Sequence, residues 1–193
     1  MANTKELILQ ISLALFARKG YEAVSVSTIA NELNMTKSAL YKHYKNKRDI
    51  FDSILERMIQ TDLERARKYN MPEGTFETTE ESYAATKIEN IKTYTEAQFR
   101  YWTEDEFASN FRKMLTLEQY QDSNMSQLYQ QYFAAGPLRY TEDLFASITN
   151  NQENAKILAL RFYAPVFALY SICDSTTKKG EILTMLRNHI YTF

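Results

Sequence analysis

Apolar residues recur every three to four positions along most of the chain, and this spacing predicts helices. The first predicted helix covers residues 4–19 and carries an apolar stripe that includes Ile8 and Leu15. Gly20 follows its last turn, where a glycine can adopt the left-handed conformation that ends many helices. Strict alternation of apolar and polar residues, typical of a half-buried strand, is scarce. The pattern therefore predicts an all-α protein.

Two short predicted helices follow the first one. Either Ser25 or Ser27 can cap the earlier of them, and the later one begins at Thr36. The turn between them needs a residue with positive φ. Asn34 is the candidate, because asparagine tolerates that conformation better than any residue except glycine. Short helices joined in this way are typical of a helix-turn-helix.

The remaining predicted helices are longer. One is capped by Asn46 and continues to about Tyr69. The segment AAGPL, at residues 134–138, is expected to kink or split a later helix, and Pro165 is expected to kink another. Beyond Tyr69 the apolar spacing predicts helices near residues 79–102, 104–121, 124–148, 152–174 and 176–191.

The side chains that begin the second short helix have the chemistry needed to read DNA. A recognition helix enters the major groove by its N-terminal end. Lys37 can donate to guanine O6 and N7, and the methyl group of Ala39 suits a thymine methyl. Lys47 lies in the first turn of the next helix, where free N–H groups attract an anion such as phosphate. The predicted DNA contacts are Ser25, Ser27, Thr36, Lys37, Ser38, Ala39, Tyr41, Lys42, His43 and Lys47.

Charge supports an anionic partner for the N-terminal part alone. The net charge of the chain is −1. Residues 1–50 carry eight basic and four acidic residues, whereas residues 51–193 carry 15 basic and 20 acidic residues. Hydrophobic residues make up 45% of the chain and charged residues 24%, an ordinary globular composition. The single cysteine, Cys173, excludes a disulfide framework and fits a reducing compartment.

The stretch ALFARKGYEAVSVSTIANELNMTKSALYKHYKNKRDIF resembles the N-terminal DNA-binding domain of TetR-family (tetracycline-repressor-like) transcriptional regulators. The resemblance covers about the first 55 residues. Its matching positions are Phe16, Gly20, Tyr21, Ser25, Ile29, Ala30, Leu40, Tyr41 and Lys47.

Four positions depart from the usual pattern of that family. Asn34 replaces a turn glycine, and Ser38 replaces a common glycine of the recognition helix. His43 stands where a phosphate-contacting tyrosine is common, and Tyr44 where a core phenylalanine is usual. Ser38 and His43 are therefore the positions where a DNA preference particular to this protein is expected.

The resemblance implies two domains, a helix-turn-helix DNA-binding domain at residues 1–47 and a larger helical domain at 48–193 that binds an effector and dimerises. Residues 51–193 hold 22 of the 26 aromatic residues. Rings with a few polar groups are typical of small-molecule sites. The predicted effector site is lined by Arg100, Trp102, Phe107, Phe111, Tyr129, Tyr132, Phe133 and Tyr163. The predicted dimer interface contains Ile157, Leu160, Phe167, Leu186 and Ile190.

These features predict a cytoplasmic repressor that binds a double-stranded DNA operator as a homodimer and is released by an effector of apolar or aromatic character. A DNA-bound adaptor whose C-terminal domain binds another protein is the alternative. The chain lacks a Gly-rich phosphate loop, G-x-S-x-G and H-E-x-x-H, so neither an enzyme nor a metal or cofactor site is expected. The N-terminus has no signal-peptide pattern, and no run of about 18 apolar residues predicts a membrane span.

Overall fold

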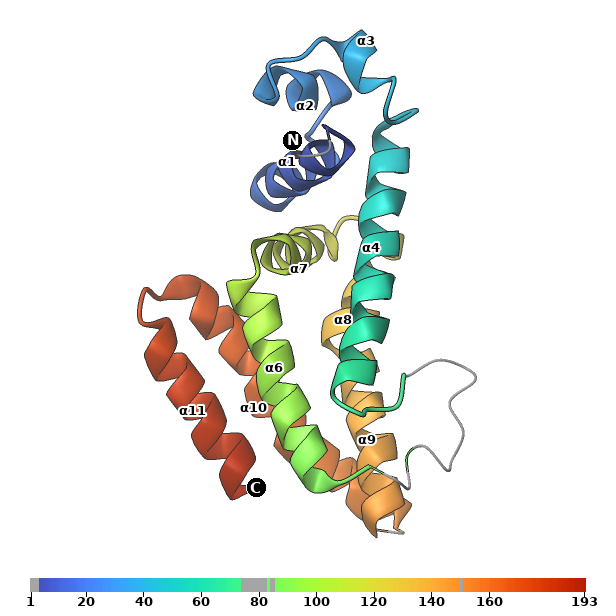
Figure 1. The fold of residues 1–193 in the computed structure, drawn as a ribbon. Coiled ribbons are helices and arrows are strands. Elements are labelled where there is room, and N and C mark those ends of the chain that lie inside the picture. The colour runs from blue at the N-terminus through green and yellow to red at the C-terminus, as the bar shows by residue number, and fades with distance from the viewer. Residues whose placement is uncertain (1–3, 74–82, 84–85, 150) are drawn as a thin grey trace. The chain divides into compact units, whose positions relative to one another are not determined.

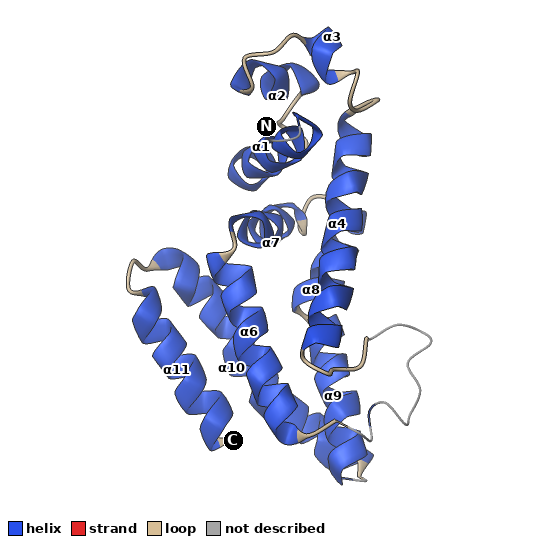
Figure 2. Ribbon diagram, in the orientation of Figure 1, coloured by secondary structure: helices blue, strands red, loops and turns tan. Residues whose placement is uncertain are grey.

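The protein is described by a computed structural model covering residues 4–73, 83, 86–149 and 151–193. Figure 2 shows helices and connecting loops, with no strand in these ranges. The predicted all-α fold is therefore confirmed. The helices, labelled in Figure 1, are α1 (Thr4–Lys19), α2 (Val26–Glu32), α3 (Lys37–Leu40), α4 (Lys47–Lys68), α6 (Ile88–Glu104), α7 (Glu106–Glu118), α8 (Ser123–Phe133), α9 (Ala135–Thr149), α10 (Gln152–Ser175) and α11 (Lys179–Thr192).

The chain divides into two compact units. The first contains residues 1–61 and 105–129, and the second contains residues 62–104 and 130–193. The predicted ranges, 1–47 and 48–193, refer to functions rather than to packing, so they stay a prediction.

The first unit is built around α1, which packs against α2 and α7. Phe16 of α1 and Phe111 of α7 are completely buried in its core. Helix α1 ends as predicted, because Gly20 has a φ of 85° and its N–H donates to the carbonyl of Phe16 at 2.9 Å. The apolar spacing of α1 thus places one face inside this unit, and its terminal glycine starts the segment that leads to α2.

The second unit contains α6, α9, α10 and α11. Helix α9 packs along α10, and α11 packs against both α10 and α6.

The predicted break at 134–138 is confirmed, because α8 and α9 are separate helices. A Cβ at Gly136 would lie 2.0 Å from the carbonyl oxygen of Gln131, so this close approach of the backbone at the junction requires a glycine. Pro137 stands in the first turn of α9, where its missing N–H is tolerated.

Helix α10 matches the predicted range of 152–174 closely, and it continues through Pro165. By length and composition alone it could cross a membrane, which differs from the sequence expectation and is weak evidence of a span. Its inward face, which includes Phe162 and Val166, is buried in the second unit. The predicted helix at 79–102 is found from Ile88 onward, and residues 79–82 and 84–85 lie outside the described residues.

Candidate nucleic-acid interface

The turn between α2 and α3 is closed by an asparagine in the left-handed conformation. Asn34 has a φ of 51°, as predicted. Its N–H donates to the carbonyl of Asn31 at 3.1 Å, and the N–H of Met35 donates to the carbonyl of Ala30 at 2.9 Å. This pair of bonds is the Schellman arrangement, which satisfies the last carbonyls of α2. Local chemistry therefore sets the direction in which α3 leaves the turn.

Two of the predicted contacts also cap the helices of this motif. The Ser25 hydroxyl accepts the N–H of Thr28 at 3.1 Å and caps α2. The Thr36 hydroxyl accepts the N–H of Ala39 at 3.1 Å and caps α3. Both residues are exposed, so each hydroxyl can still donate a hydrogen to a phosphate or base. Ser27 is exposed in the first turn of α2.

The side chains of α3 and the turn that follows it form one exposed basic and polar surface. Lys37, Ser38, Lys42 and His43 are exposed, and Tyr41 keeps 44% of its surface accessible. The Lys37 ammonium lies 5.8 Å from the centre of the Tyr41 ring, within the range of a cation–π contact. Ala39 is half-buried, beside the completely buried Leu40. We call Lys37, Ser38, Tyr41, Lys42 and His43 the α3 surface.

The charged residues in and directly after α3 are all basic. Residues 36–48 contain five lysines or arginines and no acidic residue. Asp49, directly after them, is engaged with the backbone, because its carboxylate accepts the N–H of Lys45 at 2.8 Å. Asn46 caps α4 as predicted by accepting the N–H of Asp49 at 2.8 Å. A region of this composition attracts polyanions, and each phosphate contact that it makes releases counterions.

Lys47 is placed differently from the α3 surface. Its ammonium donates to the carbonyl oxygen of Tyr21 at 2.9 Å and lies 4.2 Å from the centre of the Tyr21 ring. It also lies 3.9 Å from the Glu22 carboxylate, and its side chain is only 22% exposed. The predicted phosphate contact of Lys47 stays a prediction, and the structure adds a second role in joining α4 to the segment after α1.

The structure distributes the predicted effector-site residues between the two units. Phe107, Phe111 and Tyr129 belong to the first unit. The other five belong to the second unit, where some of them meet. The Trp102 ring lies 4.7 Å from that of Phe133 and 6.1 Å from that of Tyr132.

Two further predicted residues of the second unit make polar contacts. The hydroxyl of Tyr163 donates to the carbonyl of Phe133 at 2.8 Å. Arg100 pairs with Glu96 at 3.3 Å and Glu104 at 3.1 Å, so its charge is already balanced. The aromatic group of Trp102, Tyr132 and Phe133 is thus the part of the predicted lining that the structure brings together.

Residues absent from the predicted lining form a polar group in the same unit. Gln98 of α6 donates to the Asp62 carboxylate of α4 at 3.1 Å and to the Tyr94 hydroxyl at 2.8 Å. A signal for Asp62 exists in the sequence, because it stands four residues after Met58 and four before Ala66, both buried. Placing a carboxylate in an otherwise apolar helical stripe costs free energy unless polar partners compensate for it.

The predicted dimer residues also separate into two groups. Ile157, Leu160 and Phe167 of α10 are 54%, 56% and 37% exposed. Leu186 and Ile190 of α11 are completely buried within their own chain. Among the predicted residues, only those of α10 are therefore exposed. Helix α11 exposes other apolar residues, such as Met185, which is 52% exposed.

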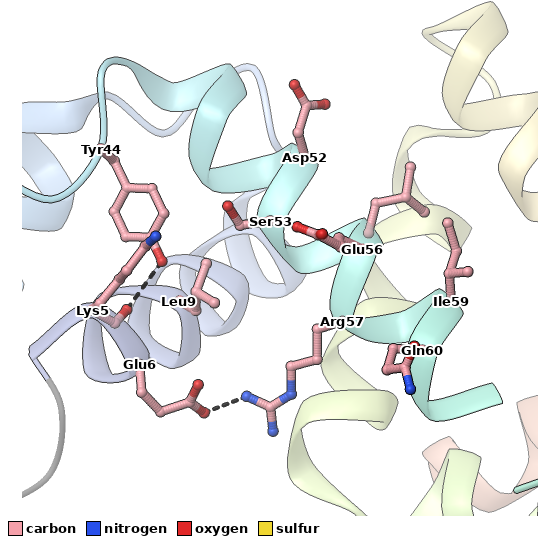
Figure 3. A pocket seen from close by; sticks show the side chains of 11 residues that line it. Lys5, Glu6, Leu9, Tyr44, Asp52, Ser53, Glu56, Arg57, Ile59 and Gln60 are labelled. Atoms are coloured by element: carbon pink, nitrogen blue, oxygen red, sulfur yellow. Dashed lines mark hydrogen bonds and ion pairs between the residues drawn. The ribbon is translucent and has the colours of Figure 1, made fainter. Parts of the chain in front are cut away.

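A surface groove in the first unit lies between α1 and α4 (Figure 3). Its volume is about 680 Å³. Glu6 and Arg57 form an ion pair across it, and the buried Tyr44 hydroxyl donates to the carbonyl of Lys5 at 3.2 Å. The groove contains none of the predicted effector-site residues. Among the described residues, no group of three histidine, cysteine or acidic side chains could hold a metal ion.

Comparison with known proteins identifies the N-terminal segment. Residues 8–54 match the family model described as bacterial regulatory proteins, tetR family. A regulator called YerO from Bacillus subtilis, described as an uncharacterized HTH-type transcriptional regulator, is 39% identical over 56 residues, 29% of this chain and 19% of that one. The negative transcriptional regulator IcaR of the biofilm operon icaADBC from Staphylococcus epidermidis is 35% identical over 52 residues, 27% of this chain and 28% of that one.

These matches span less than a third of either relative, whereas structural similarity extends along the whole chain. A transcriptional regulator from Aquifex aeolicus VF5 has a TM-score of 0.66 and 20% identity, covering 98% of this chain and 99% of that one. A complex of SmeT with triclosan has a TM-score of 0.58 and 19% identity, covering 95% and 89%. At these identities the structural likeness establishes the fold alone. Residues 8–54 thus carry the N-terminal segment typical of the TetR family, and the chain as a whole shares its fold with the regulator from Aquifex aeolicus VF5.

Proposed function

We propose that this protein is a cytoplasmic transcriptional repressor that binds a double-stranded DNA operator as a homodimer and is released from it by a small-molecule effector. The observation that carries the proposal is the α3 surface. It is exposed, basic and polar, and it follows a turn whose geometry is set by Asn34. It also lies inside the segment that matches the family model. Side chains presented in this way can enter a major groove, with Lys37 nearest the base edges.

Dimerisation is proposed because one α3 surface contacts too few bases to select a site in a genome. Ile157, Leu160 and Phe167 recur along α10 at spacings of three and seven residues, so they lie along one helical face. A second copy can cover this face about a two-fold axis. The operator should then be an inverted repeat whose half-sites lie about 34–36 Å apart, or a multiple of that distance.

Repression and release are proposed by analogy with the relatives. IcaR is described as a negative regulator, and SmeT is described in complex with triclosan. The contacts among Trp102, Tyr132 and Phe133 suit an effector of apolar or aromatic character. An effector releases the DNA if it binds more tightly to a dimer whose α3 surfaces are wrongly spaced.

Selection of bound sequences from a random double-stranded DNA library, using the purified full chain, tests this function. The expected result is an enriched inverted repeat. Lys37→Ala should then relax the preference at one base position, at a cost of about 1–3 kcal/mol. An equal loss on all sequences would make Lys37 a phosphate contact instead. Failure to enrich any sequence at low salt would contradict the proposed function itself.

A further inference from the structure

The backbone of Tyr21 connects two charged side chains that come from different helices. Its N–H donates to Oε1 of Glu118 in α7 at 2.8 Å, and its carbonyl oxygen accepts a hydrogen bond from the ammonium group of Lys47 in α4 at 2.9 Å. All three residues belong to the first unit. One residue therefore lies between a buried carboxylate and the side chain that we expect to bind a DNA phosphate.

The packing of Tyr21 leaves this residue little freedom to move. Its ring meets the rings of Phe16 and Phe51 edge-on, with centres 5.0 Å and 5.3 Å away, and Tyr21 is only 9% exposed. The Lys47 ammonium lies 4.2 Å from the centre of the same ring. Since the side chain and the backbone are both held, a shift of the Tyr21 backbone would also shift the place in which the ammonium lies.

Glu118 occupies a closely fitted position beside Gly20. It is only 3% exposed, and its Oε1 would lie 2.6 Å from a Cβ atom at Gly20, so a glycine is needed to leave room for it. Burial of a carboxylate costs free energy, and a charge-assisted hydrogen bond from a backbone N–H offsets part of that cost. Loss of the acceptor would leave the Tyr21 N–H buried without this bond, which favours a different backbone position.

The Lys47 ammonium is held in place and keeps capacity for a further acceptor. One of its three N–H groups donates to the Tyr21 carbonyl, and the carbonyl of Glu22 is a more distant acceptor at 3.5 Å. The Glu22 carboxylate lies 3.9 Å away and is 77% exposed, so it can move aside for a phosphate. A lysine already held in one conformation loses less entropy on binding than a mobile one does. The contribution of Lys47 to DNA binding therefore depends on what holds it.

We propose that Glu118 is a positioning residue for DNA binding: through the Tyr21 backbone it holds the Lys47 ammonium in the conformation that binds a DNA phosphate, without contacting DNA itself. The inference rests on the proposed function, because it adds a residue to the proposed DNA-binding machinery. It assigns a role in DNA binding to α7, which lies outside the segment that matches the family model. The position requires a hydrogen-bond acceptor rather than a negative charge.

Two substitutions at Glu118 test the requirement for an acceptor. The full chain is titrated against a fluorescently labelled DNA duplex of arbitrary sequence at several salt concentrations, since a phosphate contact acts on all sequences alike. We expect Glu118→Met to lower affinity about threefold to tenfold and to reduce the salt slope by about 1. Glu118→Gln, whose amide oxygen can accept the Tyr21 N–H, should keep the wild-type slope and an affinity within about twofold. Equal losses in both variants, or no loss in Glu118→Met, would overturn the proposal.

A double-mutant cycle with Lys47→Ala shows whether the effect of Glu118 passes through Lys47. In the Lys47→Ala background there is no ammonium to position, so Glu118→Met should change DNA affinity by less than about twofold. Losses that multiply across the two substitutions would refute the connection through Tyr21.

A buried neighbour on the same helix controls for a general loss of packing. Leu115 in α7 is completely buried, so Leu115→Ala leaves a cavity and lowers stability, but it should keep the wild-type salt slope. The same fall in slope for Leu115→Ala would show that any weakening of α7 suffices, and would rule out a specific role of Glu118. Circular dichroism shows whether each variant is folded at the temperature used.

A second way of moving the carboxylate keeps the test open if Glu118→Met does not fold. Gly20→Ala places a methyl group against Oε1 of Glu118 and should lower the salt slope in the same way. An unchanged slope in a folded Gly20→Ala variant would then overturn the proposal.

Wild-type binding separates this inference from the proposed function. If the wild type selects an inverted repeat and Lys47→Ala binds DNA with the wild-type slope, Lys47 makes no phosphate contact. The role of Glu118 is then wrong, and the DNA-binding function stands. If the wild type binds no DNA at low salt, the proposed function fails together with the inference.

Discussion

The carboxylate of Glu118 at the end of α7 accepts a hydrogen bond from the backbone N–H of Tyr21, 97 residues earlier in the chain, at 2.8 Å. The same oxygen would lie 2.6 Å from a Cβ atom at Gly20. Glu118 is only 3% exposed, and its other oxygen has no hydrogen-bond partner among the residues that the structure describes. The segment that leads from α1 to the helix-turn-helix is therefore held by a buried side chain from a distant helix of the same unit.

Substituting Gly20 by alanine should destabilise the protein through two effects. Its φ of 85° costs an alanine about 1–2 kcal/mol, and the new methyl group would displace Glu118. We expect the free energy of unfolding, measured in urea, to fall by about 2 kcal/mol or more. Gly180→Ala is the matched control, because nothing lies within 4 Å of a Cβ there, and it should be neutral or stabilise by up to about 1 kcal/mol. Equal losses in both variants would contradict this account.

Glu118 should act through its oxygen acceptor. Glu118→Gln keeps an oxygen that can accept the Tyr21 N–H, so its free energy of unfolding should stay within about 1 kcal/mol of the wild type. Glu118→Met removes the acceptor and leaves a buried N–H unpaired, at an expected cost of about 1–3 kcal/mol. Urea unfolding of the two variants measures the difference. A loss of equal size in both would show that the carboxylate has a further partner.

The turn residue Asn34 should tolerate glycine and resist alanine. Its φ of 51° is open to glycine without strain, so Asn34→Gly should change the free energy of unfolding by less than about 1 kcal/mol. Asn34→Ala should cost about 1–2 kcal/mol, because a side chain with a Cβ is disfavoured there. Thermal unfolding compares the variants. A stable alanine variant would mean that the turn can adopt another conformation, and its DNA affinity would then show whether α3 has moved.

Lys42 and Lys47 should have separable effects. Lys42 is exposed, so Lys42→Ala should leave stability within about 0.5 kcal/mol while weakening binding to all DNA sequences and reducing the salt slope by about 1. Lys47→Ala removes the hydrogen bond to the Tyr21 carbonyl as well, and should also lower the free energy of unfolding by about 1 kcal/mol. Unfolding curves measure the effect of each variant on stability, and DNA affinities at several salt concentrations measure its effect on binding. Unchanged affinity of Lys47→Ala at low salt would rule out its phosphate contact.

Tyr44 should contribute a pH-dependent term to stability at alkaline pH. Burial raises the pKa of its phenol to about 12, above the ordinary value of 10. A folded-state pKa above the unfolded value favours folding below pH 10, and this contribution is lost as pH rises from 10 to 12. Tyr44→Phe has no titrating phenol, so the stability difference between wild type and variant should narrow over that window. A constant difference from pH 8 to 12 would contradict the prediction.

Helix boundaries and caps were predictable because they depend on near neighbours. The helices that end at Gly20 and Asn34 are closed by bonds that span three to five residues, and Asn46 accepts an N–H three residues on. The side chains exposed on α3 follow from the same short-range periodicity. The contacts that near neighbours do not determine involve remote parts of the chain.

Apolar periodicity identified one face of α11 without showing what covers it. Leu186 and Ile190 were predicted at a dimer interface, whereas the chain's own helices bury them completely. Asp62 shows the converse, since its place in an apolar stripe is visible in the sequence, whereas its hydrogen-bond donor, Gln98, comes from α6. Periodicity shows which face of a helix is apolar. Only the packing of the folded chain determines which residues cover that face.

The sequence by itself determined the all-α fold, the helix-turn-helix and the side chains that α3 exposes, since these arise from propensities and hydrogen bonds within a few residues. Only the tertiary structure decided that Lys47 binds the carbonyl of Tyr21, that Glu118 holds the same segment, and that Gln98 of α6 donates to Asp62. Those relationships join residues far apart in the chain, and close packing of specific helices, rather than local preference, brings them within reach.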